Sequence, residues 1–135
     1  MATTMEEHAI SAGKAFPWHE VYVPDAQKAI EFYTSAFGMG TQSMEMGGGF
    51  TYHMLTVDGK GVAGVMSTNN PDMQGVPPQW ATYMSVDDVD ARLEKAKSLG
   101  ATVVVPPMDV PNVGRMAMIA DPQGAHIWLF KDANE

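Results

Sequence analysis

The 135-residue sequence contains 8 Lys and Arg against 16 Asp and Glu, has a formal net charge of −8, and contains no Cys. Phosphate backbones and anionic membranes would be repelled, and disulfides, thiolate metal sites and a cysteine nucleophile are excluded. This length suits one compact domain, and no apolar run approaches the roughly 20 residues of a membrane-spanning helix. We therefore expect a cytoplasmic protein with no nucleic-acid or membrane partner.

The first half of the chain predicts a strand, a helix and three further strands. Residues 1–15 lack sustained periodicity, so we expect them to form a flexible leader. Alternation over residues 16–23 predicts the first strand, and the helix should begin after Asp25 and stop at Gly38. Extended runs follow at about residues 41–46, 50–57 and 62–66, separated by the hairpin signals Gly47-Gly48-Gly49 and Asp58-Gly59.

The second half repeats this order after a polar connection at residues 67–79. A strand at residues 82–86 precedes a helix that Asp87 or Asp88 caps and Gly100 ends. Three more strands are expected at about residues 102–105, 115–119 and 126–130, with a long loop from Pro106 to Gly114 and a turn at Asp121-Pro122-Gln123-Gly124.

The spacing of the two halves indicates an internal duplication. Val23 and Val86, which close the first strand of each half, are 63 residues apart. Gly38 and Gly100, which follow the two helices, are 62 residues apart. We therefore predict a single domain over residues 16–135, built of two βαβββ modules at residues 16–66 and 80–131.

Two such units at this spacing resemble the vicinal oxygen chelate superfamily, which includes glyoxalase I, bleomycin-resistance proteins and extradiol dioxygenases. The resemblance rests on the Val-x-Asp helix starts, Phe-Tyr in the first helix and Asp-Pro-Gln-Gly before the last strand. It covers about residues 16–131 and is greatest for the uncharacterised glyoxalase-like branch. It implies an α+β fold, in which two tandem βαβββ modules form a curved eight-stranded sheet, an incomplete barrel, around a cavity. It also implies a homodimer.

The resemblance further identifies the positions that bind a divalent metal in enzymes of this superfamily. These positions correspond here to Trp18, Ala81 and Trp128, with a fourth near Gly64, and none of these side chains can ligate a metal. We therefore expect no cofactor and no metal site of the family type. A slip of one residue in the first strand would turn His19 into the cavity and make a metal plausible again.

Alternation places Glu20 on the face of the first strand that also carries Trp18 and Tyr22. Val21 and Val23 suit the side that packs on a helix, so Glu20 should line the cavity. A buried carboxyl group can act as a general acid or base near neutrality, and we expect this role for Glu20. The alternative is a structural carboxylate that is bonded to a neighbour such as Arg115 or Tyr22.

The last strand supplies the other candidate residues. Ile127 and Leu129 suit the helix side, which turns His126, Trp128 and Phe130 toward the cavity. His126 is therefore the candidate functional histidine, with a bonded structural role as the alternative.

Arg115 begins an otherwise apolar strand, so its charge requires an anion or the rim of the cavity. We expect that anion to be Glu20 or a carboxylate of the ligand.

Together these residues predict a glyoxalase-like protein that binds a small, partly apolar or aromatic molecule. The binding residues would be Trp18, Tyr22, Tyr83, Trp128 and Phe130. As an enzyme of the lyase or isomerase class, it would perform metal-independent acid–base chemistry next to a carbonyl with Glu20, His126 and Arg115. Two alternatives remain open, namely a non-catalytic binder of the bleomycin-resistance kind and a metal-dependent lyase or dioxygenase.

Overall fold

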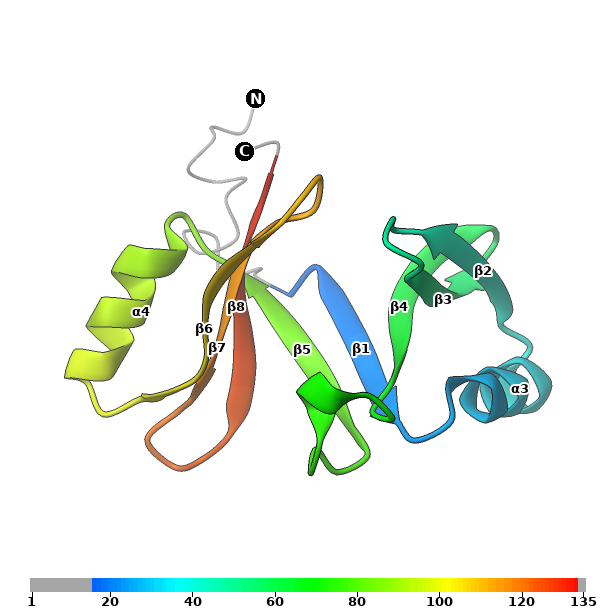
Figure 1. Ribbon diagram of the computed structural model, residues 1–135, viewed down its shortest axis with the longest axis horizontal. Helices are drawn as coiled ribbons and strands as arrows, with labels where there is room; N and C mark the ends of the chain where they lie inside the picture. Colours follow the sequence, from blue (N-terminus) through cyan, green and yellow to red (C-terminus); the bar gives the residue numbers. More distant parts are fainter. Residues whose placement is uncertain (1–15, 134–135) are drawn as a thin grey trace. The chain divides into compact units, whose positions relative to one another are not determined.

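The computed structural model describes residues 16–133, whose course Figure 1 follows by colour. The predicted leader at residues 1–15 lies outside the described residues, as do residues 134 and 135. The chain divides into two compact units, one spanning Trp18–Ala81 and the other containing Thr82 onward. Each unit contains one helix and the main part of one four-stranded module, which confirms the α+β class and the two tandem βαβββ modules.

The first module contains four strands and helix α3. Its elements are β1 (Trp18–Val23), α3 (Ala26–Phe37), β2 (Gly40–Glu45), β3 (Thr51–Val57) and β4 (Lys60–Ser67). They are ordered β2-β3-β4-β1 across the sheet. The β2–β3 and β3–β4 pairs are antiparallel, whereas β1 pairs with β4 in parallel.

Local signals fix the ends of the elements in this module. The Asp25 carboxylate accepts a hydrogen bond from the backbone N–H of Lys28 at 3.1 Å, and Gly38 ends α3 in the left-handed region at φ 73°. The turn between β3 and β4 holds Asp58 at φ 52° and Gly59 at φ 77°, the two positive φ values that a tight hairpin turn of this kind requires. These predicted boundaries are confirmed.

Helix α3 covers one face of the first sheet. Ile30 of the helix packs against Val21, Leu55 and Val65, which come from three different strands and are each at most 3% exposed. Truncation of a fully buried residue such as Leu55 to Ala costs about 2–5 kcal/mol, because both the transfer free energy and the packing contacts are lost. The position of Val21 in this core confirms the predicted orientation of the first strand.

The second module repeats the arrangement with helix α4. Its elements are β5 (Gln79–Ser85), α4 (Val89–Ser98), β6 (Thr102–Val110), β7 (Gly114–Ala120) and β8 (His126–Asp132). They are ordered β5-β8-β7-β6, and β5 pairs with β8 in parallel as β1 does with β4. The connection between the modules contains a single 3₁₀ turn, Pro71–Met73.

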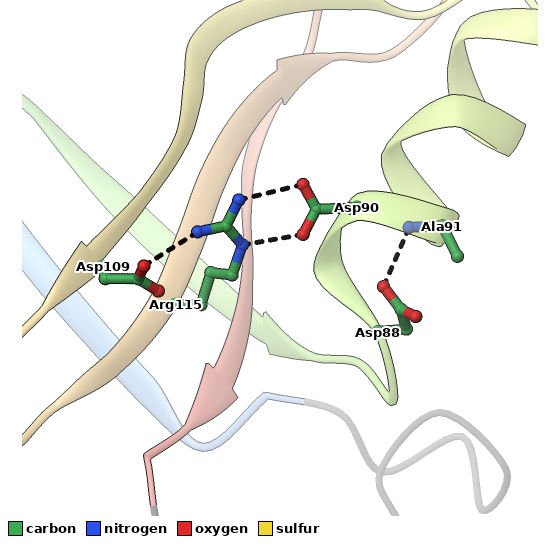
Figure 2. Close-up of polar contacts among 5 residues, drawn as sticks. All are labelled: Asp88, Asp90, Ala91, Asp109 and Arg115. Carbon is green, nitrogen blue, oxygen red and sulfur yellow. Dashed lines mark hydrogen bonds and ion pairs between the residues drawn. The ribbon is translucent and has the colours of Figure 1, made fainter.

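The helix of the second module is capped by Asp88 rather than Asp87. The Asp88 carboxylate accepts a hydrogen bond from the backbone N–H of Ala91 at 2.9 Å, as Figure 2 shows. The caps Asp25 and Asp88 are 63 residues apart, which supports the predicted duplication. The core beneath α4 contains Val86, Val89, Leu93, Ala117, Ile119 and Leu129.

One predicted segment is wrong. The loop expected from Pro106 to Gly114 is mostly strand, because β6 continues to Val110. Two prolines are tolerated there because β6 lies at the edge of the sheet, and its register with β7 is irregular between Val105 and Met108. The backbone N–H groups that proline lacks are therefore not needed for pairing at this point.

Candidate functional site

Glu20 is a buried carboxylate on the face of β1 that points away from α3, and its side chain is held by two tyrosines. It is 5% exposed. The Tyr22 hydroxyl donates to Glu20 Oε1 at 3.0 Å, and the Tyr52 hydroxyl donates to Oε2 at 2.5 Å. The shorter distance is typical of an O–H group that donates to an ionised oxygen. Both carboxylate oxygens therefore have a phenol donor.

The Tyr52 hydroxyl is itself held by Trp18, whose Nε1–H donates to Tyr52 Oη at 2.8 Å. Because an indole N–H can only donate, Tyr52 must accept this bond and direct its own hydrogen to Glu20. Burial, followed by the negative charge of Glu20, raises the pKa of Tyr52 above its ordinary value. The Tyr52 phenol thus stays protonated at neutral pH. Trp18 donates a hydrogen bond to Tyr52, and Tyr52 donates one to Glu20.

Gly64 of β4 provides the space for this arrangement. It lies opposite Glu20 in the parallel pairing of β1 with β4. A Cβ atom at this position would overlap Tyr52 Oη and would lie 2.6 Å from Tyr52 Cζ and 3.0 Å from Glu20 Cγ. Only glycine therefore lets the Tyr52 ring lie across the strand and reach the carboxylate.

Sequence reasoning missed both Tyr52 and Gly64 as parts of the site. Alternation within β3 places Tyr52 and Met54 on one face and Leu55 on the other, but Met54 and Leu55 are equally apolar. The structure decides between the two faces by burying Leu55 under α3. A second signal was the pairing of a glycine with Glu20, which becomes visible only when the register is known.

A second aromatic group lies on the sheet of the other module. The Tyr83 and Trp128 rings are stacked with centroids 5.3 Å apart and an interplanar angle of 4°, and Phe130 meets Tyr83 edge-on at 6.1 Å. Leu129, between the two β8 aromatics, packs in the core beneath α4. The prediction that Trp128 and Phe130 face away from the helix is therefore confirmed.

His126 lies at the exposed start of β8, two residues before Trp128 and opposite Ala120 in the register with β7. Alternation gives His126 and Trp128 the same face. The structure thus places the candidate histidine at the edge of the aromatic group, and its chemical role stays a prediction.

Arg115 is engaged within its own module. Its Nε and Nη2 donate to the Asp90 carboxylate at 2.7 and 3.0 Å, and Nη1 donates to Asp109 at 3.0 Å (Figure 2). These bonds raise the pKa of Arg115, and the bond from Arg115 lowers the pKa of Asp90. Because Asp90 is in the first turn of α4, Arg115 lies on the helix side of β7. The sequence predicted that Arg115 pairs with Glu20 or with a carboxylate of the ligand. The structure corrects this prediction, because Arg115 pairs with Asp90 and Asp109.

Most of the sequence matches a known family model. Residues 15–129 match the family model described as the Glyoxalase/Bleomycin resistance protein/Dioxygenase superfamily. The protein belongs to this superfamily. The resemblance inferred from the two Val-x-Asp helix starts and the Asp-Pro-Gln-Gly turn is confirmed.

Relatives within the superfamily carry several different names. The Mycobacterium tuberculosis protein named "Putative glyoxylase CFP32" is 39% identical over 86% of this chain, and the anthracycline biosynthesis protein DnrV of Streptomyces peucetius is 34% identical over 84%. The chain spans only 43% and 46% of the lengths of these two relatives. The uncharacterised protein Rv0887c of M. tuberculosis is 33% identical over 94% of this chain and 79% of its own length.

Several solved structures share the fold at low sequence identity. Methylmalonyl-CoA epimerase from M. tuberculosis superposes with a TM-score of 0.59 and 21% identity, with 89% of each chain covered. A hypothetical protein from Bacillus halodurans superposes with a TM-score of 0.62 and 13% identity, covering 89% of this chain and 95% of that one. These similarities support the fold alone.

The pairing of the strands shows which positions correspond in the two modules. Glu20 pairs with Gly64 in the first module as Tyr83 pairs with Trp128 in the second, so positions 64 and 128 correspond in the duplication. His19 lies on the helix side of β1, as predicted, because side chains two positions apart share a face and Val21 packs under α3. Within residues 16–133, no three His, Asp or Glu side chains are grouped as metal ligands.

None of the helices in the described part of the chain is long and apolar enough to cross a membrane. The cavity expected between the modules, the homodimer and the cytoplasmic location stay predictions.

Proposed function

We propose that this glyoxalase-like protein binds a small, partly apolar or aromatic carbonyl compound on the face that carries Glu20, and that Glu20 moves a proton next to that carbonyl. The observation that carries the proposal is the buried Glu20 carboxylate held by the hydroxyls of Tyr22 and Tyr52. A buried charge of this kind is costly unless it is fully bonded.

The proposed step uses groups of this chain alone. Glu20 takes the proton from the carbon next to the carbonyl, the C–H electron pair moves into the C–C bond, and the carbonyl oxygen becomes an enolate oxygen. Once protonated, Glu20 needs fewer donors. The Tyr22 hydroxyl, whose bond to Glu20 is the longer of the two at 3.0 Å, is then available to stabilise the enolate oxygen. Tyr52, fixed by Trp18, keeps the carboxyl group in place.

The proposed chemistry is metal-independent because of the residues at the family ligand positions. Trp18, Ala81, Trp128 and the position near Gly64 offer no donor atom that binds a divalent cation. Elemental analysis of the purified protein tests this proposal. About one equivalent of zinc, nickel, iron or manganese per chain, lost on substitution of His19 or His126, would instead favour the metal-dependent lyase or dioxygenase.

Deuterium exchange tests the catalytic proposal directly. Phenylacetone is a neutral aromatic ketone whose hydrogens next to the carbonyl are observable by NMR in D₂O. The wild-type protein should accelerate their exchange, and Glu20→Gln should reduce the rate roughly 100-fold or more while the ketone still binds. The matched control is Glu45→Gln, which alters an exposed carboxylate on β2 and should leave the rate unchanged. Equal exchange rates in Glu20→Gln and wild type would contradict the assignment of Glu20 as the base.

A second candidate function is non-catalytic binding, and the stacked rings of Tyr83 and Trp128 favour it. Tyr83 is buried and Trp128, which stacks on it, is half-buried, so the Trp128 ring is the part of this stack that offers apolar surface to an aromatic compound. For such a binder, Trp128→Ala should cost about 1–3 kcal/mol of binding free energy, while Glu20→Gln changes little.

The matched control for the binder is Trp80→Ala, because Trp80 is 49% exposed and contacts Tyr33 of α3 instead. The protein would be a non-catalytic binder if it binds phenylacetone without accelerating deuterium exchange. In that case Trp128→Ala should weaken the binding and Trp80→Ala should not.

A further inference from the structure

Within residues 16–133, the lysines and arginines avoid one side of the sheet in each module. Seven of them fall within residues 16–133. Four are on helices, namely Lys28 on α3 and Arg92, Lys95 and Lys97 on α4. The other three, Lys60, Arg115 and Lys131, are on strands, and their orientation decides which side of the sheet carries positive charge.

All three strand residues point to the helix side. Arg115 bonds to Asp90 of α4, and Lys131 lies opposite Arg115 in the register of β7 with β8, so both are on that side. Lys60 precedes Gly61, where a Cβ atom would lie 3.0 Å from Met54 Sδ and 3.5 Å from the Trp18 ring. Gly61 is therefore on the face of Trp18 and Glu20, and alternation turns Lys60 to the other face.

Among the described strand residues of the first module, the face opposite α3 therefore carries no Lys or Arg. Glu20 lies there with Trp18, Tyr22 and Tyr52, and the register adds Met54, Met66, Gln42 and Met44. Among these residues Glu20 is the only charged one. In the second module the corresponding face, which carries Trp128, likewise has no Lys or Arg among the described residues.

We propose that the Glu20 site selects an electrically neutral ligand, an aldehyde or ketone without a carboxylate or phosphate group near its carbonyl. This inference rests on the function proposed above. An anion that approaches the Glu20 carboxylate would lose water and meet a like charge. No Lys or Arg on the described strands of this face is there to compensate for that loss. The Tyr22 and Tyr52 hydroxyls cannot compensate, because both already donate to Glu20.

The apolar part of the neutral ligand is assigned to the β2–β3 hairpin. Met44 lies opposite Tyr52 in the pairing of β2 with β3, and the Phe50 ring lies 6.5 Å from the Tyr52 ring. Met44 is 44% exposed and Phe50 is 47% exposed. These two side chains therefore extend the face of Glu20 with accessible apolar surface, and the flexible thioether of Met44 adapts to different ligand shapes.

A matched pair of ketones tests the selection. Phenylacetone and phenylpyruvate share a benzyl group on the carbonyl carbon and differ in a methyl against a carboxylate group. Calorimetric titration at low ionic strength should give at least roughly tenfold weaker binding of phenylpyruvate, because of the like charge of Glu20. In Glu20→Gln, the difference in affinity between phenylacetone and phenylpyruvate should be smaller than in the wild-type protein. Phe50→Ala should weaken phenylacetone binding several-fold, whereas Phe37→Ala, which removes an exposed ring of α3, should not.

The outcomes separate this inference from the proposed function. Binding of phenylpyruvate as tight as that of phenylacetone would overturn the selection for a neutral ligand and leave the proposed function standing. An unchanged difference between the two ketones in Glu20→Gln would remove Glu20 as its cause. Failure of wild-type protein to bind either ketone would overturn the proposed function and this inference with it.

Discussion

Gly64 is the position where one added methyl group tests the geometry of the Glu20 site most directly. In Gly64→Ala the new Cβ would overlap Tyr52 Oη and lie 2.6 Å from Tyr52 Cζ, so the Tyr52 ring has to move and its bond to Glu20 is lost. Overpacking of this kind costs typically about 1–3 kcal/mol. This loss is partly offset, because alanine lowers the conformational entropy of the unfolded chain and thereby stabilises the folded protein by about 0.4–1 kcal/mol.

The expected net change for Gly64→Ala is a loss of about 1–2 kcal/mol in the free energy of unfolding, measured by urea denaturation with circular dichroism. For a chain of this size, the corresponding fall in Tm is about 4–8 °C. The matched control is Gly61→Ala on the same strand, where the nearest atom is the flexible Met54 Sδ at 3.0 Å, and a smaller change is expected.

A double-mutant cycle then identifies the cause. In a Tyr52→Ala background the ring is absent, so Gly64→Ala should cost little there, and the two substitutions should be strongly coupled. The reasoning is refuted if Gly64→Ala costs as much without the Tyr52 ring as with it, or if the single substitution leaves stability unchanged.

Three further predictions concern the caps, the alkaline stability and the assembly. Asp25→Ala and Asp88→Ala should each lower the free energy of unfolding by about 0.5–2 kcal/mol, since each removes a helix cap; denaturation curves that coincide with wild type would contradict this. The pKa of the Tyr52 hydroxyl is higher in the folded than in the unfolded chain, so above about pH 10 the hydroxyl ionises first in the unfolded chain. The free energy of unfolding should therefore decrease as the pH rises above this value. In Tyr52→Phe the slope of this decrease should be smaller by up to about 1.4 kcal/mol per pH unit. A slope as steep in Tyr52→Phe as in wild type would show that Tyr52 is not responsible. Light scattering at micromolar concentration should give the mass of a homodimer, and a single-chain mass would remove that prediction.

Local chemistry made much of the fold predictable. Asp25 with Gly38 and the turn at Asp58-Gly59 act within a few residues of themselves, so their positions in the sequence were enough to place the ends of α3 and the β3–β4 hairpin. The same applies to alternation, which correctly separated Glu20 from Val21. The extent of β6 was misjudged because its prolines are compatible with an edge strand, and edge position is a property of the whole sheet.

What the sequence by itself determined about this protein is the duplicated βαβββ order and the face of Glu20. Only the tertiary structure decided which groups meet there. Tyr52 reaches Glu20 across 32 positions of sequence, and Arg115 reaches Asp90 across 25. Alternation assigns a residue to a face, but its partners on that face depend on the register between strands and on which face the helix covers. Those are set by packing of the whole module, because no single segment buries its apolar side alone.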